Sequence, residues 1–233
     1  IFAPGPYHRD RLIRGKICNE KKIKLIGQPK FDWIEKHQKS EERFFNNNNP
    51  IFYYNPHWDM NLSSYLTWRN IILDFFRKHS DYNLVFAPHP LVKHLAKINK
   101  YTLENKNDSA DNIIIDLDSS KLNDGTYNKI ADVYIGDVSS MVTEWINFRP
   151  RSCIFINSHK IRWDEKESYS MWKYGTVVDS PDSLGEVIDE SLKKNDHYQK
   201  QVNHQNEFIH KSEKSASDLF ADYIYEKLEF GNE

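Results

Sequence analysis

The sequence predicts an α/β protein in which helices cover both faces of a parallel sheet. Short β-branched and aromatic runs without polar alternation recur along the chain, which is typical of strands buried on both faces. Segments with apolar residues at helical spacing separate these runs, and parallel strands need crossover helices of this kind. The composition agrees, because 39% apolar residues and 28% charged residues of both signs are typical of a globular chain.

The first strand is expected at residues 51–54, where Ile-Phe-Tyr-Tyr ends at an Asn-Pro step. A helix is expected next, because the apolar residues of 68–76 keep the i, i+3, i+4, i+7, i+8 spacing of one helical face. The stretch 157–170 is charged and aromatic, and we expect a mobile loop over a site or an insertion there. The other expected strands are 83–87, 113–115, 133–135, 153–156 and 176–178, and the other expected helical segments are 91–98, 121–130 (helical or irregular), 141–148 and an amphipathic terminal helix over 216–228.

Length, charge and cysteine content limit the class of protein. A chain of 233 residues corresponds to one or two domains, and the polar run at 46–50 (Asn-Asn-Asn-Asn-Pro) is an expected boundary. The formal net charge of −2 argues against a nucleic-acid binder, which normally carries a basic excess. Two cysteines, Cys18 and Cys153, exclude a disulfide framework and a cysteine zinc site. Neither a membrane-spanning run nor a signal peptide is visible, so the cytoplasm is the expected location.

Two histidines directly follow predicted strands. Ligands of parallel α/β sheets bind beyond the carboxyl ends of the strands, so these positions are informative. His57 follows the first strand, and His89 follows the second between two prolines that fix its backbone. Each can bind a phosphate or act as a general acid or base, which makes both candidate catalytic residues. The alternative for each is a structural histidine in a turn.

The fourth predicted strand is followed by a turn with two serines. Asp137 begins this turn, and Ser139 and Ser140 open a helix that also holds Glu144. Hydroxyl groups beside the free N–H groups of a helix N-terminus suit a phosphate. The alternative is that Asp137 or Ser139 is only an N-cap, which is the commonest role of these residue types. Glu144 can accept hydrogen bonds from the hydroxyl groups of a ribose or lie on a solvated helix surface.

Several common site motifs are absent from the sequence. Neither GxGxxG nor GxxxxGK[ST] occurs, which argues against an ordinary NAD-binding domain and a Walker-type kinase. GxSxG is also absent, which argues against an α/β-hydrolase. The histidine spacings match no zinc motif, and no acidic cluster indicates a magnesium site. We therefore expect no metal and no cofactor.

Six short segments match the motifs of one known family in order, from about Gly27 to Leu228. The matches are residues 27–32 (GxPRxD), 54–58 (YAPTWR), 86–90 (KPHP), 131–144 (ADVLITDYSSxxxD), 147–156 (LGKPxIFY) and 214–217 (DGxAS). The chain therefore resembles the CDP-glycerol glycerophosphotransferases, the family of teichoic-acid-type and capsule polymerases. Its wider relatives are the GT-B glycosyltransferases and the UDP-sugar 2-epimerases.

The resemblance implies a Rossmann-like domain, the C-terminal half of a GT-B-type fold. Residues 46–233 would bind the nucleotide donor, and residues 1–45 would be the end of an acceptor-side domain and a linker. Since the chain opens without Met, we expect it to begin within a larger gene product. The implied roles are contact with the donor pyrophosphate or help to the leaving group for His89, phosphate binding for Ser139 and Ser140, shaping of the serine turn for Asp137, proximity to the ribose for Glu144, and donor binding for Ser215 and Ser217.

The sequence departs from the family pattern in the acceptor half and in the first loop. His57 stands where the family has Thr, and Asp59 stands where an Arg is common. Residues 212–214 lack the glycine of the family motif. The family's acceptor-side histidine, its usual candidate general base, has no counterpart here, and His8 is not an obvious substitute.

By resemblance, the leading hypothesis is transfer of glycerol phosphate, or a similar polyol phosphate, from a CDP-activated donor. The acceptor would be a growing capsule or teichoic-type polymer or a lipid-linked acceptor, at the inner face of the cell membrane. One alternative is a GT-B glycosyltransferase that uses a nucleotide sugar. Another, from a different class, is a donor-binding module that is inactive in isolation.

Overall fold

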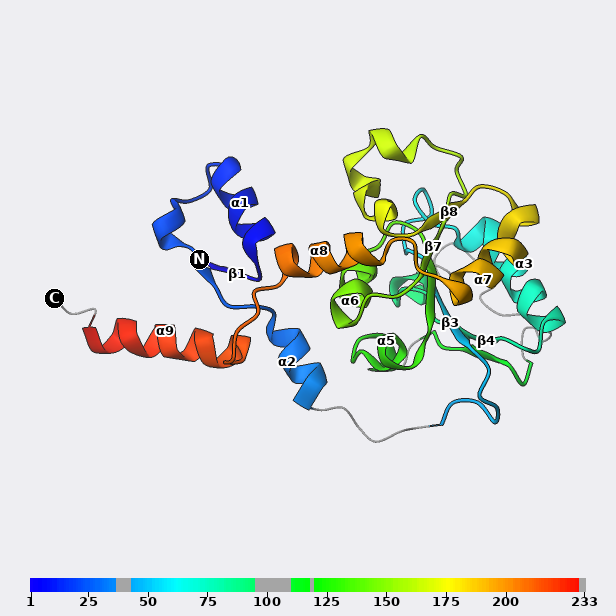
Figure 1. Cartoon of the computed structure of the whole chain (residues 1–233), viewed down its shortest axis with the longest axis horizontal. Helices are drawn as coiled ribbons and strands as arrows, with labels where there is room; N and C mark the ends of the chain where they lie inside the picture. Colours follow the sequence, from blue (N-terminus) through cyan, green and yellow to red (C-terminus); the bar gives the residue numbers. More distant parts are fainter. Residues whose placement is uncertain (37–42, 95–109, 118–119, 231–233) are drawn as a thin grey trace. The chain divides into compact units, whose positions relative to one another are not determined.

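The computed structural model describes residues 1–36, 43–94, 110–117 and 120–230. The chain forms two compact units (Figure 1). The larger unit is Glu41–Lys200, and the smaller unit combines Ile1–Ser40 with Gln201–Glu233. Among the described residues, no helix is long and apolar enough to cross a membrane.

The larger unit is built on a six-stranded sheet in which every neighbouring pair is parallel. Its strand order is β5-β4-β3-β6-β7-β8, so the chain starts in the middle, fills one side and then returns to fill the other. This is the order of the doubly wound, Rossmann-type sheet, and it confirms the predicted fold class. The strands are β3 (Ile51–Asn55), β4 (Asn83–Phe86), β5 (Ile113–Ile115), β6 (Val133–Gly136), β7 (Cys153–Ile156) and β8 (Thr176–Val178).

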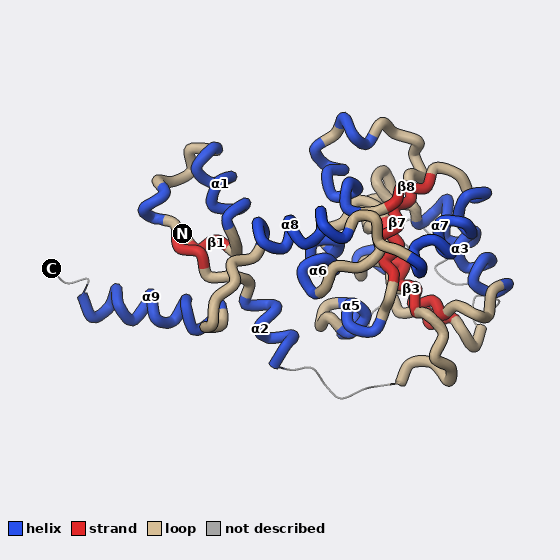
Figure 2. Tube along the Cα trace, viewed as in Figure 1, coloured by secondary structure: helices blue, strands red, loops and turns tan. Residues whose placement is uncertain are grey.

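Helices cover both faces of this sheet (Figures 1 and 2). Phe52 and Tyr54 of β3 pack on one face with the helices α3 (Tyr65–Lys78) and α7 (Leu184–Lys193). The intervening Tyr53 packs on the other face, against α5 (Thr126–Ile130) and α6 (Met141–Phe148). Since successive strand residues point to opposite faces, both sides of β3 must be apolar. This explains why the strands lack polar alternation.

Two predicted segments, 91–98 and 157–170, differ in part from the expectation. Of the helix expected at 91–98, residues 91–94 are helical and the rest lies outside the described residues. The stretch expected as a mobile loop or an insertion contains the 3₁₀ helix Trp163–Glu165 and the first part of another, Glu167–Tyr174. Its Tyr169 and the following Trp172 are buried in the core, where Trp172 stacks on Phe155. Ile161, Trp163 and Tyr169 thus pack against the core, whereas most of the other residues of this stretch are exposed.

The smaller unit contains two short parallel strands and several helices. The strands are β1 (Phe2–Ala3) and β2 (Lys24–Leu25), and the terminal helix α9 (Ala216–Phe230) packs Phe220 and Tyr223 on Phe2. The terminal helix was predicted, whereas β1 and β2 were not, because two-residue strands carry no periodic signal. The remaining elements are α1 (Pro6–Arg14), the 3₁₀ helix Glu20–Lys22 and α2 (Pro29–Lys36), together with α8 (Tyr198–Phe208), which begins in the larger unit.

Candidate functional site

The strand order brings three polar loops to one edge of the large sheet. β3 lies between β4 and β6, and the chain reverses its direction of winding at the β3–β6 pair. Ligands of doubly wound sheets bind beyond the carboxyl ends of the strands at such a reversal. The loops that follow β3, β4 and β6 carry His57, His89 and Asp137. The structure therefore joins three sequence-predicted residues at the position that the topology favours for a ligand.

Backbone hydrogen bonds tie these loops together. The backbone N–H of His89 donates to the Pro56 carbonyl oxygen (3.1 Å), which links the loop after β4 to the loop after β3. The backbone N–H of His57 donates to Asp137 Oδ1 (2.9 Å), which links the loop after β3 to the turn after β6. The two half-buried imidazole rings lie 6.4 Å apart between centroids. Both histidines are thus held by their own backbones rather than by side-chain contacts alone.

The ring nitrogens of the two histidines have the same local geometry. His57 Nδ1 accepts the Asp59 backbone N–H at 3.0 Å, and His89 Nδ1 accepts the Leu91 backbone N–H at 3.2 Å. Burial lowers the pKa of both rings, and the neighbouring His57 lowers the pKa of His89 further. The carboxylate of Asp59 acts in the opposite direction and raises the pKa of His57.

The carboxylate of Asp137 is completely buried and connects two elements. Besides the His57 N–H it accepts the backbone N–H of Ser64 (2.6 Å) and the Ser64 hydroxyl (2.8 Å), both on Oδ2. Burial raises the pKa of this carboxyl from 3.8 to about 6, although the hydrogen bonds from Ser64 and His57 act to lower it. With its carboxylate so occupied, Asp137 fixes the loop after β3, including the start of α3, to the end of β6.

The two serines of the turn after β6 have different surroundings. Ser139 Oγ accepts the Met141 N–H at 3.1 Å, so this side chain caps the first turn of α6. Ser140 is the N-cap residue by position, but its exposed hydroxyl makes no capping hydrogen bond. The hydroxyl that remains available beside the helix N-terminus is therefore that of Ser140. Glu144 is half-buried and lies in the first turn of α6.

The serines near the start of α9 belong to the smaller unit. Ser215 Oγ accepts the Asp218 backbone N–H at 3.1 Å and donates to Asp218 Oδ2 at 2.7 Å, so it caps α9. The Ser217 N–H donates to Asp32 Oδ2 of α2 at 3.1 Å. Both serines thus have structural roles within their unit, and a role in donor binding stays a prediction.

Sequence reasoning missed two residues that hold this site. Ser64 supplies two of the hydrogen bonds to Asp137, and Trp172 Nε1 donates to the Asp137 carbonyl oxygen at 3.2 Å. A serine just before a helical pattern is a signal for a helix start, so Ser64 could have been singled out. No sequence signal identifies Trp172, because its contact depends on how the segment 157–174 folds back.

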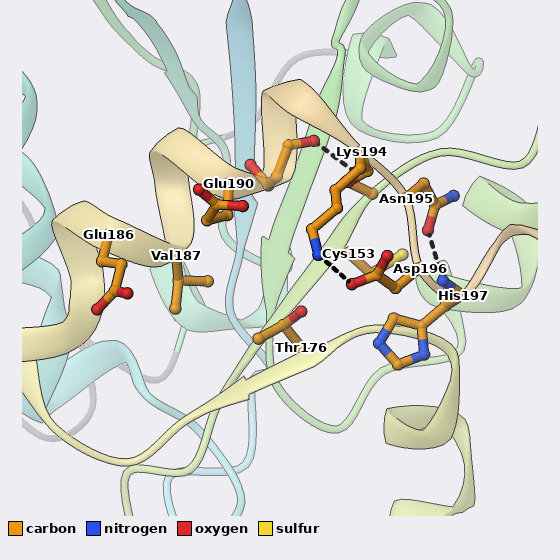
Figure 3. A pocket seen from close by; sticks show the side chains of 11 residues that line it. Cys153, Thr176, Glu186, Val187, Glu190, Lys194, Asn195, Asp196 and His197 are labelled. Atoms are coloured by element: carbon orange, nitrogen blue, oxygen red, sulfur yellow. Dashed lines mark hydrogen bonds and ion pairs between the residues drawn. The ribbon is translucent and has the colours of Figure 1, made fainter.

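A cavity of about 240 Å³ lies at another place in the larger unit (Figure 3). Cys153 and Thr176, the first residues of β7 and β8, line it, so it is at the amino ends of these strands. The rest of its lining is mostly polar and includes the ion pair between Lys194 Nζ and Asp196 Oδ2 (2.9 Å). The candidate site lies at the carboxyl ends of the strands, so this cavity is separate from it. Over the described ranges, no group of three or more His, Cys, Asp or Glu side chains could hold a metal ion.

Comparisons with known proteins identify the family and the fold of the chain. The family model described as CDP-glycerol:poly(glycerophosphate) glycerophosphotransferase matches residues 4–226. The solved structure of the wall teichoic acid polymerase TagF is similar to the chain, with a TM-score of 0.70 at 16% identity. The match covers all of this chain and 59% of the TagF chain. UDP-GlcNAc 2-epimerase from Methanocaldococcus jannaschii has a TM-score of 0.56 at 19% identity, over 97% of this chain and 60% of its own. The enzyme of the same name from Neisseria meningitidis has a TM-score of 0.58 at 14% identity, over 97% of this chain and 60% of its own. The chain thus spans about three fifths of these structures, and no curated protein matches it in sequence.

Proposed function

The chain belongs to the CDP-glycerol:poly(glycerophosphate) glycerophosphotransferase family, and from this premise we propose that it is the donor-binding part of a polymerase. The reaction is transfer of glycerol phosphate, or a similar polyol phosphate, from a CDP-activated donor to a growing teichoic-type or capsule polymer. One observation carries the proposal. His57, His89 and Asp137 lie together where the strand order changes direction, next to the N-terminus of α6.

Residues 46–233 are proposed as the donor-binding region, with 1–45 as the end of the acceptor side and the linker. The donor phosphates would lie between the histidine loops and the first turn of α6, where the positive end of the helix dipole favours an anion. Ser140 and His89 would then donate to phosphate oxygens. Ser139 and Asp137 would hold the turn in shape, since their side chains already accept backbone N–H groups.

Glu144 is proposed near the ribose of the donor. Its half-buried carboxylate lies in the first turn of α6, so it is close in the chain to the proposed phosphate site. A carboxylate can accept hydrogen bonds from both hydroxyl groups of a ribose. A role in donor binding is also proposed for Ser215 and Ser217.

The chemical step is a phosphoryl transfer. A hydroxyl of the acceptor attacks the β-phosphorus of the donor, a new P–O bond forms, and the bond to the bridging oxygen breaks. CMP leaves with the electron pair of that bond, and the hydroxyl proton passes to a base on the acceptor side. Such reactions depend mainly on positioning and on stabilisation of phosphate charge, which the hydrogen-bond donors of serines and histidines and a helix N-terminus can supply.

An assay of nucleotide release distinguishes two further candidate functions from the first. The likeness to UDP-GlcNAc 2-epimerases favours a nucleotide sugar as the second donor class, in which the sugar C1–O bond would break. The third candidate, from another class, is a donor-binding module that is inactive in isolation. Release of CMP indicates the first reaction, release of UDP indicates the second, and binding without turnover indicates the third.

The test is calorimetric titration of the protein with CDP-glycerol, CDP and UDP-GlcNAc. We expect the cytidine ligands to bind, and we expect His89→Ala to weaken binding by roughly 1–3 kcal/mol through loss of a hydrogen bond to a charged group. His159→Ala is the matched control, because His159 is exposed and lies outside the three loops. Absence of binding by every ligand, or equal affinities of wild type and His89→Ala, contradicts the proposal.

A location at the inner face of the cell membrane is proposed as well, because polymers on lipid-linked acceptors grow there. Cell fractionation tests this directly. We expect the complete protein in the membrane fraction and its release by high salt, as for a peripheral protein. Recovery of the complete protein in the soluble fraction at low salt contradicts it.

A further inference from the structure

His57 is a residue of the site that departs from the family pattern, because it stands where the family motif has Thr. The structure makes this histidine a counterpart of His89. Both follow a proline, both begin a loop at the carboxyl edge of the sheet, and the Nδ1 of each accepts a backbone N–H from the residue two positions later. A repeated geometry on neighbouring loops points to a shared chemical role.

The hydrogen bonds on Nδ1 define the protonation of both rings. A ring nitrogen that accepts an N–H carries no proton, so the proton of the neutral imidazole is on Nε2. Forming the imidazolium would put a proton on Nδ1 and break the hydrogen bond from Asp59 or Leu91. In this conformation each ring therefore offers Nε2–H as a donor and has no lone pair with which to accept a substrate proton.

The backbones of both residues are anchored by hydrogen bonds, and their rings lie close enough to contact one ligand. His57 is anchored to Asp137 and His89 to Pro56, and the ring centroids are 6.4 Å apart. Oxygens on one pyrophosphate can span such a separation. The threonine of the family motif has no side-chain N–H group, so it cannot donate in the same way.

We propose that His57 and His89 act as a pair of neutral N–H donors that bind the phosphate oxygens of the nucleotide donor, and that neither is the general base. The inference rests on the proposed function and assigns the role of the two histidines within it. It makes His57 a binding residue at a position where the family motif has Thr. It also places the base elsewhere, on the acceptor side of the complete protein.

The charged groups around the pair are consistent with neutral rings. From the loop after β3, Asp59 raises the pKa of His57, but burial outweighs it. From the loop after β4, His89 faces His57, and each would be opposed by a charge on the other. From the turn after β6, the carboxylate of Asp137 bonds to the His57 backbone rather than to its ring. Both pKa values are therefore below the ordinary 6.5.

Glutamine and asparagine distinguish the two ring nitrogens. The side-chain amide of Gln reaches about as far as Nε2 and can donate there, whereas that of Asn reaches only about as far as Nδ1. We expect His57→Gln and His89→Gln to bind CDP-glycerol within about threefold of wild type. We expect His57→Asn and His89→Asn to bind about tenfold more weakly, the equivalent of about 1.4 kcal/mol. Thermal unfolding of each variant checks that the loops remain folded, and calorimetry at pH 7.5 gives the affinities.

The outcomes separate this inference from the proposed function. If wild type binds neither CDP nor CDP-glycerol, the proposed function is wrong, and so is the role of the two histidines that rests on it. If wild type binds but Gln and Asn variants are equally weak, a donor at the Nε2 position is not the requirement, and the inference is wrong. If His57→Asn binds CDP-glycerol as tightly as wild type, His57 is not a member of the pair. An affinity that rises steeply between pH 8 and pH 6 in wild type, and not in the Gln variants, shows binding by the imidazolium and also overturns it.

Discussion

The buried carboxylate of Asp137 makes the stability of the larger unit depend on pH in an unusual direction. Its pKa in the folded protein is about 6, above the ordinary value of 3.8, because burial disfavours the charge more than three hydrogen bonds favour it. Between these two pH values the folded state holds the proton more tightly than the unfolded state. The contribution of this group to the free energy of unfolding is therefore greatest at low pH and is lost as pH rises from about 4 to about 6.

The size of the effect follows from the two pKa values. The difference between about 6 and 3.8 corresponds to about 3 kcal/mol of unfolding free energy at neutral pH. Asp137→Asn removes this charge, but it places an NH2 group where one carboxylate oxygen now accepts hydrogen bonds. At least one N–H donor of the loop after β3 then faces another donor, which costs about 1–3 kcal/mol for an unsatisfied buried group. The two effects are of similar size, so we expect Asn to change stability at pH 7 by less than about 2 kcal/mol.

The assay is urea unfolding of wild type and Asp137→Asn at pH 4.5, 5.5, 6.5 and 7.5. Other carboxyl groups titrate in both proteins, so the difference between the two curves isolates Asp137. We expect wild type to lose about 2 kcal/mol relative to the variant between the lowest and highest pH. Parallel curves would refute the reasoning, because they would mean that the pKa of Asp137 is the same in the folded and unfolded states.

Three other substitutions test the surroundings of the site. Ser140→Ala should weaken binding of CDP by roughly 1–3 kcal/mol in calorimetry and leave unfolding unchanged, because its hydroxyl makes no capping bond; an unchanged Kd contradicts the proposed phosphate site. Gly136→Ala should destabilise by about 1–3 kcal/mol, because the added Cβ would lie 2.4 Å from the Tyr134 hydroxyl, and Tyr134→Leu should relieve this in a double-mutant cycle; strict additivity would argue against the contact. Trp172→Phe should cost about 1 kcal/mol in urea unfolding through loss of the Nε1 hydrogen bond to Asp137, and an unchanged midpoint would contradict that role.

The strands were predictable from the sequence because their burial is uniform. β5, β7 and β8 begin and end at the predicted residues, and β3 and β6 are one residue longer than predicted. A strand covered on both faces has only apolar neighbours, so each appears as a short run of apolar and β-branched residues. The two-residue strands of the smaller unit and the segment 157–174 gave no such signal, because their structure depends on contacts with distant residues.

The site was only partly accessible from the sequence. Position after a strand was enough to single out His57, His89 and the turn after β6, since that argument needs only strand assignments. The contacts between them need the strand order, which no local pattern contains. Asp137 illustrates this, because in the sequence it is one residue of the serine turn. In the structure its carboxylate accepts hydrogen bonds from residues 80 and 73 positions away.

Departures from a family motif can also be explained in pairs once the structure is known. Where the family block has Leu and Thr, this chain has Tyr134 and Gly136. The Tyr134 hydroxyl occupies the space where a side chain at 136 would lie, so the larger residue requires the smaller one. The same hydroxyl lies 3.4 Å from the Asn55 carbonyl oxygen at the end of β3 and donates to it. The paired change therefore adds a side-chain contact to the backbone pairing at the ends of β3 and β6, where the loops that carry His57 and Asp137 begin.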